Sequence, residues 1–226
     1  MLNKPGGEEI AVVDLQRLGW NQVITAGSQF IAGAAVTLQQ LAEVPGIQTQ
    51  LKQAIYLEAN ANLRQMATLA GSLVAAEGRS PLLTAFLALN PVLVWEPDQQ
   101  EINLGEWLPL RNHFRPGLLI REIKWSSTVR LAIEYIARTP LDRPVVCAAV
   151  ARWPSNLTRV ALGGYGGVPV TAMDGTTAVG AEIAAQSAYS GKKDAWASAT
   201  YRQLMAEVLV RRCLAGLAAG DQEGDV

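Results

Sequence analysis

The sequence is poor in the side chains that most often carry catalysis or hold metals. It has one histidine, His113, and two cysteines, Cys147 and Cys213, among 226 residues. Two cysteines cannot ligate an iron–sulfur cluster or a four-cysteine zinc. A single histidine argues against a histidine-based triad or a histidine-rich metal site. Motifs of the GxSxG, HExxH, CxxC and P-loop types are also lacking. We therefore predict no catalytic residue and no metal site in this chain.

The sequence also lacks an excess of charge of one sign and lacks long apolar runs. The chain has 19 lysines and arginines against 20 acidic residues, and this balance argues against nucleic acid as a partner. No apolar run reaches the ~18 residues that cross a bilayer, and the polar start Met1–Glu9 has no apolar segment of a signal peptide. Half of the residues are hydrophobic, enough for a core. Without a spanning or signal segment, we expect a soluble protein with no membrane contact. Two distant cysteines give no disulfide framework, so we expect it in the reducing cytoplasm.

The pattern along the chain predicts an α+β fold. Capping chemistry gives the clearest helix signals: Thr37 with Gln40 forms a capping box, Ser80-Pro81 matches N-cap and N1, and Ser198 can cap a long C-terminal helix. The remaining predictions are strands at 10–15 and 29–34 joined by loops over 18–28, a helix over 47–55, an ordered loop over 60–72, a helix from 81 to 89, and a hairpin of 92–95 with 101–104.

A turn at Arg115-Pro116-Gly117 is predicted to separate two lobes. After it we expect a strand over 118–125 and a hairpin of 145–153 with 157–162. Alternation over 129–136 suggests a strand, but a helix fits almost as well and periodicity does not decide between them. The last helix should turn Tyr201, Met205, Leu209 and Cys213 toward a sheet, and both cysteines should be core residues. Glu58, Glu77, Glu122 and Glu134 are expected on solvated faces.

Two segments rich in small residues could approach a ligand closely. Gly163–Gly167 follows a predicted strand, as a phosphate loop does, but Val168-Pro169 stands where a helix would have to start, so a turn is favoured over a ligand loop. In Thr68–Ser72, backbone N–H groups and two hydroxyls could form a nest for a pyrophosphate. That pattern alone is a weak signal, because small-residue loops are common.

Five stretches of the chain, taken in order, carry a family resemblance. They are Ile31–Thr37, Leu63–Leu73, Phe114–Ile123, Val160–Gly164 and Ser198–Leu214. They resemble the motifs IGAxxT, IRNxATIGGNL, LRPGELLxEI, VALGG and SAEYRxxxAxVLxRRAL of the FAD-binding subunits of molybdenum hydroxylases. That family includes the medium subunit of carbon monoxide dehydrogenase and the flavin domain of xanthine dehydrogenase. The resemblance spans nearly the whole chain.

This resemblance implies a fold, a cofactor and partners. It implies that residues 1–114 form the second subdomain of an FAD-binding domain, and that residues 115–219 form a C-terminal domain of three antiparallel strands and three helices, before an acidic tail at 220–226. It implies an FAD-dependent oxidoreductase subunit that passes electrons from an iron–sulfur subunit and works with a molybdenum-cofactor subunit; a homo-oligomer is compatible with it. The cofactor-binding residues that it implies are Gly33, Thr68, Leu69, Ala70, Gly71, Ser72, Phe114 and Leu119.

Departures from the family pattern predict weak or absent FAD. An N-terminal subdomain with a first glycine-rich loop is expected to be missing. Ala70 stands at the first glycine of the family's GG pair, Ser72 replaces an asparagine, and Pro81 stands at the position of an aspartate. A methyl group can block close backbone approach, and proline supplies no carboxylate. The alternative function is therefore a flavin-free relative that acts as a structural or subunit-interaction protein.

Overall fold

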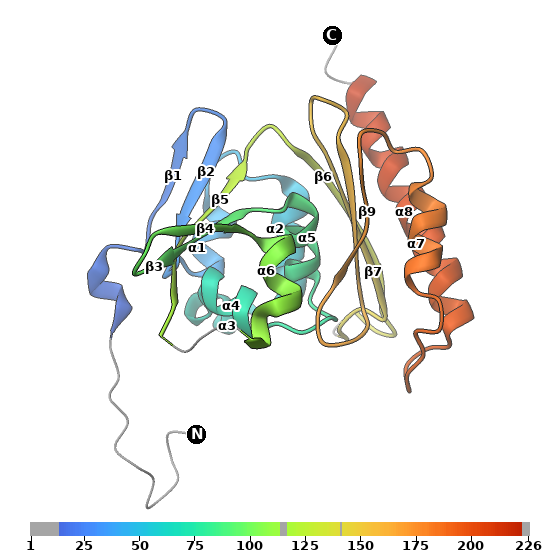
Figure 1. The fold of residues 1–226 in the computed structure, drawn as a ribbon, viewed down its shortest axis with the longest axis horizontal. Coiled ribbons are helices and arrows are strands. Elements are labelled where there is room, and N and C mark those ends of the chain that lie inside the picture. Colours follow the sequence, from blue (N-terminus) through green and yellow to red (C-terminus); the bar gives the residue numbers. More distant parts are fainter. Residues whose placement is uncertain (1–13, 114–116, 141, 223–226) are drawn as a thin grey trace, which may run out of the picture.

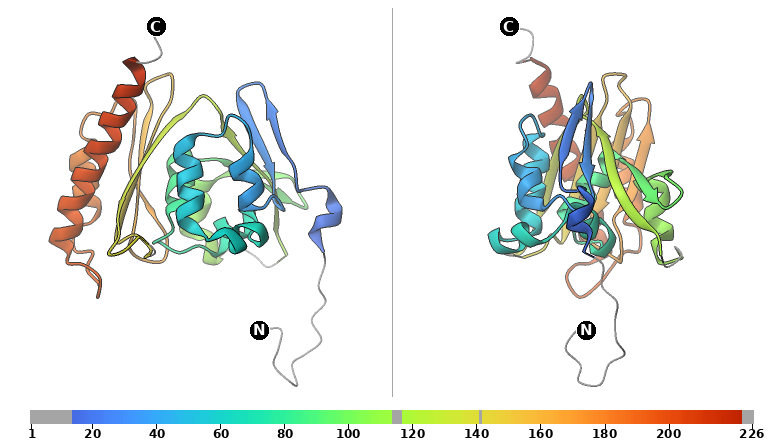
Figure 2. Two further views of the ribbon diagram at one scale, coloured as in Figure 1. Left: turned by 180° about the vertical axis from the view of Figure 1, so that it is seen from behind. Right: turned by 90° about the vertical axis from the view of Figure 1, so that its left-hand side faces the viewer.

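The chain folds into four layers of alternating sheet and helix. A computed structural model describes residues 14–113, 117–140 and 142–222. In Figure 1 a five-stranded sheet, a layer of helices, a four-stranded sheet and an outer helix pair follow one another. Figure 2 shows α1 (Leu38–Glu43) and α2 (Thr49–Glu58) from behind, and α2 packs against the edge strand of the second sheet that begins at Arg130. The predicted strand at 10–15 lies largely outside the described residues, and Leu15 begins a short 3-10 helix, η1 (Leu15–Leu18).

The first sheet has the order β1-β2-β5-β3-β4 and is antiparallel throughout. Its strands are β1 (Val23–Ala26), β2 (Gln29–Gly33), β5 (Leu119–Ser126), β3 (Val92–Glu96) and β4 (Gln100–Asn103). Register places Phe30 of β2 opposite Trp125 of β5, and their rings lie 5.4 Å apart. The prediction of β2 and of the β3–β4 hairpin is confirmed, whereas β1 lies where we expected only loops.

The second sheet has the order β6-β7-β8-β9, also antiparallel. Its strands are β6 (Arg130–Ile136), β7 (Val146–Arg152), β8 (Thr158–Gly163) and β9 (Val170–Gly175). The ambiguous segment at 129–136 is a strand, and the predicted hairpin β7–β8 is confirmed. The sheet has four strands rather than the three that we expected. The fourth, β9, pairs with β8 at the edge, and its mostly exposed residues give little apolar signal in the sequence. Its outer face is covered by α7 (Ala181–Ala188) and α8 (Ala199–Gln222).

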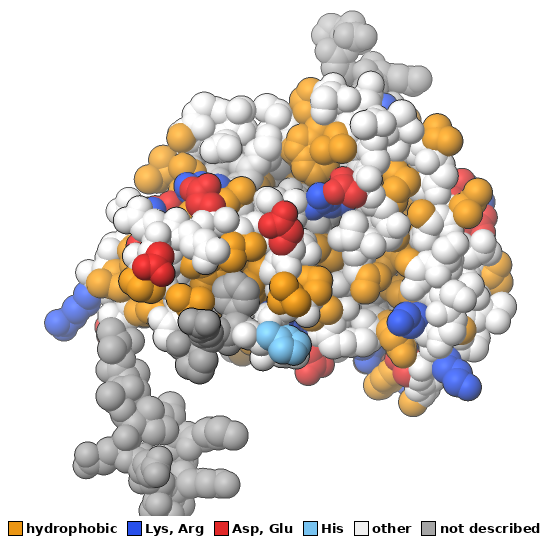
Figure 3. Space-filling model, in the orientation of Figure 1, with side chains coloured by type: hydrophobic (Ala, Val, Ile, Leu, Met, Phe, Trp, Pro, Cys, Tyr) orange, Lys and Arg blue, Asp and Glu red, His pale blue; other side chains and the backbone are white. Residues whose placement is uncertain are grey.

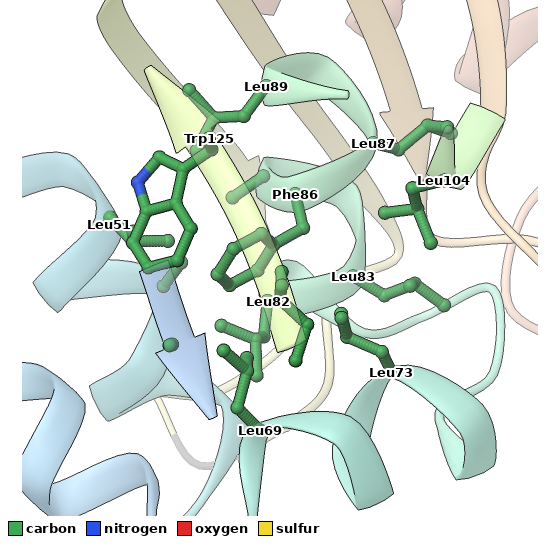
Figure 4. Packing of buried hydrophobic residues seen from close by; sticks show 14 of the residues in the cluster. Leu51, Leu69, Leu73, Leu82, Leu83, Phe86, Leu87, Leu89, Leu104 and Trp125 are labelled. Carbon is green, nitrogen blue, oxygen red and sulfur yellow. The ribbon is translucent and has the colours of Figure 1, made fainter. Parts of the chain in front are cut away.

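Helix α5 (Pro81–Leu89) is buried between the two sheets. Ser80 caps it as predicted, since its hydroxyl accepts the N–H of Leu83 at 2.9 Å. All nine residues of the helix are buried, and Figure 4 shows its leucines and Phe86 pointing outward on all sides. The rings of Phe86 and of Trp125 in the first sheet form a T-shaped pair, with their centroids 5.5 Å apart. The same apolar cluster includes Leu131, Cys147 and Ala161 of the second sheet.

Glu58 departs from its expected place on a solvated face. Its side chain is 9% exposed, and its carboxylate accepts a 2.5 Å hydrogen bond from Ser80 Oγ and a 3.3 Å bond from the N–H of Leu82. A carboxylate at this position satisfies helix donors and opposes the positive end of the helix dipole. Both cysteines, by contrast, are buried as predicted, and burial raises the pKa of Cys147 to about 12.

The segment over 60–72 is two short helices rather than the ordered loop that we predicted. They are α3 (Ala61–Met66) and α4 (Leu69–Ala75). Asn60 accepts the N–H of Leu63 at 3.0 Å, and Thr68 accepts the N–H of Gly71 at 3.2 Å, so each helix begins at a polar cap. The helices are too short to show an apolar period. The helix opened by Thr37 and Gln40 has its full capping box as predicted.

The strand β5 does not belong with the C-terminal strands, and that part of the prediction is wrong. It pairs with β2 and β3 and so forms the middle of the first sheet. The chain passes from one sheet to the other after Ser126 and before Arg130. Strand pairing is non-local, so the turn chemistry at 115–117 could not reveal the partners of β5. The division into domains between residues 114 and 115 stays a prediction. The boundary between the two sheets falls later, between Ser126 and Arg130.

The long helix α8 faces the second sheet with a stripe that is partly shifted from the prediction. Leu209 and Cys213 are buried, as expected, but Tyr201 is 41% exposed. The buried positions are Arg202, Ala206, Leu209, Val210, Cys213 and Leu217. The buried stripe begins at Arg202. Its guanidinium is buried because it donates to Val145 O before β7 and to Gly164 O after β8.

We predict that Phe86→Ala destabilises the fold by about 3–5 kcal/mol, because it removes a buried ring between the two sheets and leaves a cavity. Urea denaturation followed by circular dichroism measures this loss. Tyr56→Ala is the matched control, since Tyr56 is a half-exposed aromatic residue on α2, and it should cost less than about 1 kcal/mol. Equal losses in the two variants would contradict the central role of α5.

Candidate functional site

An apolar cavity of about 430 Å³ lies beside α4, and we call it the α4 cavity. One wall is formed by Thr68, Ala70, Gly71 and Val74 at the start of α4. The facing walls come from β2–α1, β3, α6 (Leu104–Trp107), η2 (Leu108–His113) and β5, and they include Ala34, Ala35, Trp95, Trp107, Arg111, Leu119 and Ile120. Figure 3 shows hydrophobic side chains gathered over α4 and α6 on one face of the molecule.

The local sequence explains why α4 offers small residues to this cavity. Leu69 and Leu73 are fully buried and point into the core beneath α5 (Figure 4). Helical periodicity then leaves Ala70, Gly71 and Val74 on the opposite side, and Gly71 and Val74 are exposed. A side chain at Gly71 would place its Cβ 2.9 Å from Thr68 Oγ1. The cap of the helix therefore favours glycine at this position.

Four of the eight expected cofactor-binding residues line the α4 cavity: Thr68, Ala70, Gly71 and Leu119. Leu69 is buried in the core, and Ser72 is half-buried and lies outside the lining. Gly33 is also outside the lining. A Cβ there would lie 2.2 Å from the carbonyl oxygen of Trp20, so Gly33 permits a close backbone approach. Phe114 lies outside the described residues.

The sequence analysis missed the two tryptophans and the arginine of the cavity. The rings of Trp95 and Trp107 lie 5.4 Å apart at an interplanar angle of 48°. Arg111 donates a 2.5 Å hydrogen bond to Ala76 O and a 3.0 Å bond to Gly167 O. These contacts join η2 to the end of α4 and to the glycine-rich run. The sequence signal for the tryptophans was their presence in a chain in which only 6% of the residues are aromatic.

The expected nest of N–H groups is only partly available. The N–H of Leu69 donates to Val36 O at 2.8 Å, and that of Gly71 donates to Thr68 Oγ1 at 3.2 Å. Both donors are therefore used within the protein. The helix cap at Thr68, which the loop prediction did not foresee, accounts for the Gly71 donor, and the antiparallel bridge between Thr37 and Thr68 accounts for the Leu69 donor.

The run Gly163–Gly167 is a turn between β8 and β9, as favoured, and it packs closely on its neighbours. A Cβ at Gly163 would lie 2.1 Å from Thr84 Oγ1, and one at Gly164 would lie 2.3 Å from Val145 O. The buried guanidinium of Arg202 donates to Gly164 O at 2.8 Å and, more closely, to Val145 O. Arg202 thereby fixes the glycine run to the start of β7.

Asp194 neutralises Arg202 with a bidentate hydrogen bond, in which both oxygens lie 2.7 Å from Nη2. Burial alone would raise the pKa of Asp194, but the hydrogen bonds from Arg202 and from the N–H groups of Trp196 and Ala197 outweigh it, so the pKa lies below its ordinary value. A carboxylate with a lowered pKa stabilises the folded state above its unfolded pKa, and this contribution is lost as pH falls through the folded pKa.

Within the described ranges, no three side chains of His, Cys, Asp or Glu lie together as metal ligands. None of the helices in those ranges is both long enough and apolar enough to span a bilayer.

The chain joins an α+β part that holds the α4 cavity to a second antiparallel sheet with two covering helices. The sequence profile described as the FAD binding domain in molybdopterin dehydrogenase matches residues 4–124. The chain belongs to this family, whose members are flavoprotein oxidoreductases with FAD as cofactor. The resemblance stated from the motifs is thus confirmed.

Solved structures share the fold over most of the chain. A chain of quinoline 2-oxidoreductase from Pseudomonas putida 86 superposes with a TM-score of 0.72 and 17% identity, covering 89% of this chain and 79% of that one. Carbon monoxide dehydrogenase from Hydrogenophaga pseudoflava gives 0.69 and 20% identity, covering 87% and 77%. The enzyme from Oligotropha carboxidovorans gives 0.71 and 18%, with the same coverage. A search of curated protein sequences finds no match.

We predict that Asp194→Asn lowers the melting temperature at pH 7 and that the difference from the wild type shrinks as pH falls below the ordinary carboxyl pKa of 3.8. The reason is that protonation removes the same charge in the wild type. Differential scanning calorimetry between pH 3 and pH 7 measures this. Asp174→Asn is the comparison, since Asp174 lies on the edge strand β9 and forms a more exposed ion pair with Arg159 of β8. A difference for Asp194→Asn that stays constant down to pH 3 would contradict the ionic role.

Proposed function

We propose that this chain is the FAD-binding electron-transfer subunit of a molybdenum hydroxylase-type complex, and that the α4 cavity receives the flavin ring. The observation that carries the proposal is the meeting of Thr68, Ala70 and Gly71 with Leu119 at one cavity. These residues come from two motifs about 50 positions apart in the sequence, both of which resemble family motifs. Structure thus brings together residues that only the resemblance had linked.

The cavity fits the ring system better than the whole dinucleotide. Its volume of about 430 Å³ lies at the lower end of the ~300–1,000 Å³ found for sites that hold drug-sized ligands. Its walls are mostly aliphatic and aromatic, and the small residues Ala34, Ala35 and Gly71 leave room for a flat group. Aromatic and apolar walls suit a planar heteroaromatic ring, because they bury its faces without unpaired polar atoms.

The residues of the chain have distinct roles in this proposal. Trp95 and Trp107 form a buried wall that excludes water, and Leu119 and Ile120 continue it along β5. Arg111 adds positive charge at the end near α4, where it is held by backbone carbonyls. When bound, FAD supplies the capacity to accept and pass on electrons. The protein positions the group and limits access of solvent.

The diphosphate of FAD has fewer partners than the family pattern would give. The N–H groups of Leu69 and Gly71 are already bonded to Val36 and Thr68. Pro81 is buried as the first residue of α5 and supplies no carboxylate. Each charged hydrogen bond that is lost costs roughly 1.5–3 kcal/mol. We therefore propose weak FAD binding by this chain alone. The same observation favours a second candidate, a flavin-free subunit that keeps the fold.

The proposed partners supply the electrons. A flavin relay needs an electron donor, and the two cysteines of the chain are fewer than the four thiolates that an iron–sulfur cluster takes. In this proposal, which follows the family resemblance, one partner subunit carries the cluster and another carries the molybdenum cofactor. The specific substrate would then be set by the molybdenum subunit.

We predict that the purified chain binds FAD with a dissociation constant of a micromolar or more, and that Val74→Trp weakens binding at least about tenfold. Val74 is 47% exposed at the cavity wall, so an indole there fills the cavity without disturbing the core. Equilibrium dialysis measures the affinity without interference from tryptophan fluorescence.

The control is Val179→Trp, because Val179 is 86% exposed and does not line the α4 cavity. It should bind FAD as the wild type does. Equal affinity of Val74→Trp and the wild type would place the flavin elsewhere. No binding even at millimolar FAD would exclude the flavoprotein proposal and leave the flavin-free candidate.

A further inference from the structure

A second cavity of about 270 Å³ lies on the other side of Arg111, and we call it the glycine-run cavity. Its polar lining comes from three separate segments: Arg111 and Asn112 of η2, the turn Tyr165–Gly167, and Tyr189 with Lys192 after α7. Apolar residues of η2, β8, the segment 168–170 and the end of α7 complete it. Apart from Arg111, none of these residues lines the α4 cavity, so the flavin proposal leaves this site unexplained.

The carbonyl groups of the four glycines in the run each accept a hydrogen bond within the protein. Gly163 O accepts from the Tyr189 hydroxyl at 2.5 Å and Gly164 O from Arg202 at 2.8 Å. Gly166 O accepts from the N–H of Gly78 at 3.2 Å and Gly167 O from Arg111 at 3.0 Å. Four acceptors are thereby removed from the cavity.

The N–H groups of the same turn remain available. Across the described part of the chain, those of Tyr165, Gly166 and Gly167 donate to no protein acceptor. Gly166 has a φ angle of +73°, in the left-handed region that occurs in turns whose N–H groups bind anions. The turn therefore places three N–H groups without a protein acceptor beside the cavity, while the carbonyl groups of its four glycines are used within the protein.

Positive charge accompanies these donors. Arg111 and Lys192 line the cavity, and no acidic side chain does. Within residues 14–113, 117–140 and 142–222, neither cation forms an ion pair with a carboxylate. Two cations and a set of N–H groups from different segments match a ligand with several acceptor oxygens and negative charge.

We propose that the glycine-run cavity binds a phosphate or diphosphate group. Its volume is below the ~300–1,000 Å³ of sites for drug-sized ligands, so it can hold a phosphate or diphosphate with a small part of an organic group. The phosphate could come from FAD itself, since Arg111 adjoins both cavities, or from a separate phosphate-bearing ligand. The site stands on its own residues and does not require that the α4 cavity binds a flavin.

Isothermal titration of inorganic pyrophosphate into the full chain, at constant ionic strength, tests the proposal. Lys192→Gln should weaken binding about 3- to 30-fold, because it removes one charge-assisted hydrogen bond. Lys193→Gln is the matched control, since it removes the same charge from the adjacent exposed residue, which does not line the cavity. It should leave the affinity unchanged.

Competition identifies the source of the phosphate. Pyrophosphate binding that millimolar FAD suppresses supports the site as the seat of the FAD diphosphate, and binding that FAD leaves unchanged supports a separate ligand. Absence of pyrophosphate binding at millimolar concentration would overturn the proposal. An equal loss in Lys192→Gln and Lys193→Gln would also overturn it, because the effect would then be a general one of net charge.

Discussion

Helix α5 exposes none of its nine residues and packs against both sheets, so the positions of the two sheets depend on it. Each fully buried leucine or phenylalanine contributes about 1.5–3 kcal/mol. It also positions walls of both cavities. Its C-cap residue Asn90 accepts the N–H of Gly105 at 2.9 Å and so positions α6 with Trp107. Thr84, within the helix, packs so closely on Gly163 that only a glycine fits there. Packing of one helix thus determines where both cavities form.

Arg111 connects the two cavities physically. It lines both of them, and its hydrogen bonds to Ala76 and Gly167 join the end of α4 to the turn between β8 and β9. A ligand in the α4 cavity and an anion in the glycine-run cavity would both contact the same guanidinium. Binding at one site would then change the affinity of the other site for its ligand through this side chain.

Local chemistry made much of the fold predictable. The caps Thr37, Ser80 and Ser198 each accept the helix N–H that the sequence indicated. The edge strands β1 and β9 were missed because most of their residues are exposed or half-buried, and β5 was misassigned because its pairing is non-local. In the α4 cavity, the family motifs predicted Thr68 and Leu119. Arg111 was missed because its contacts bridge segments 35 and 56 positions away.

Hydrogen–deuterium exchange with and without millimolar FAD tests most directly whether the α4 cavity is the flavin site. The proposed site predicts slower exchange in the presence of FAD at the backbone amides of α4 and of the start of β5, with no change in α8, which covers the far face of the second sheet. Protection confined to α7 and α8, or none at FAD concentrations where dialysis shows binding, would contradict it.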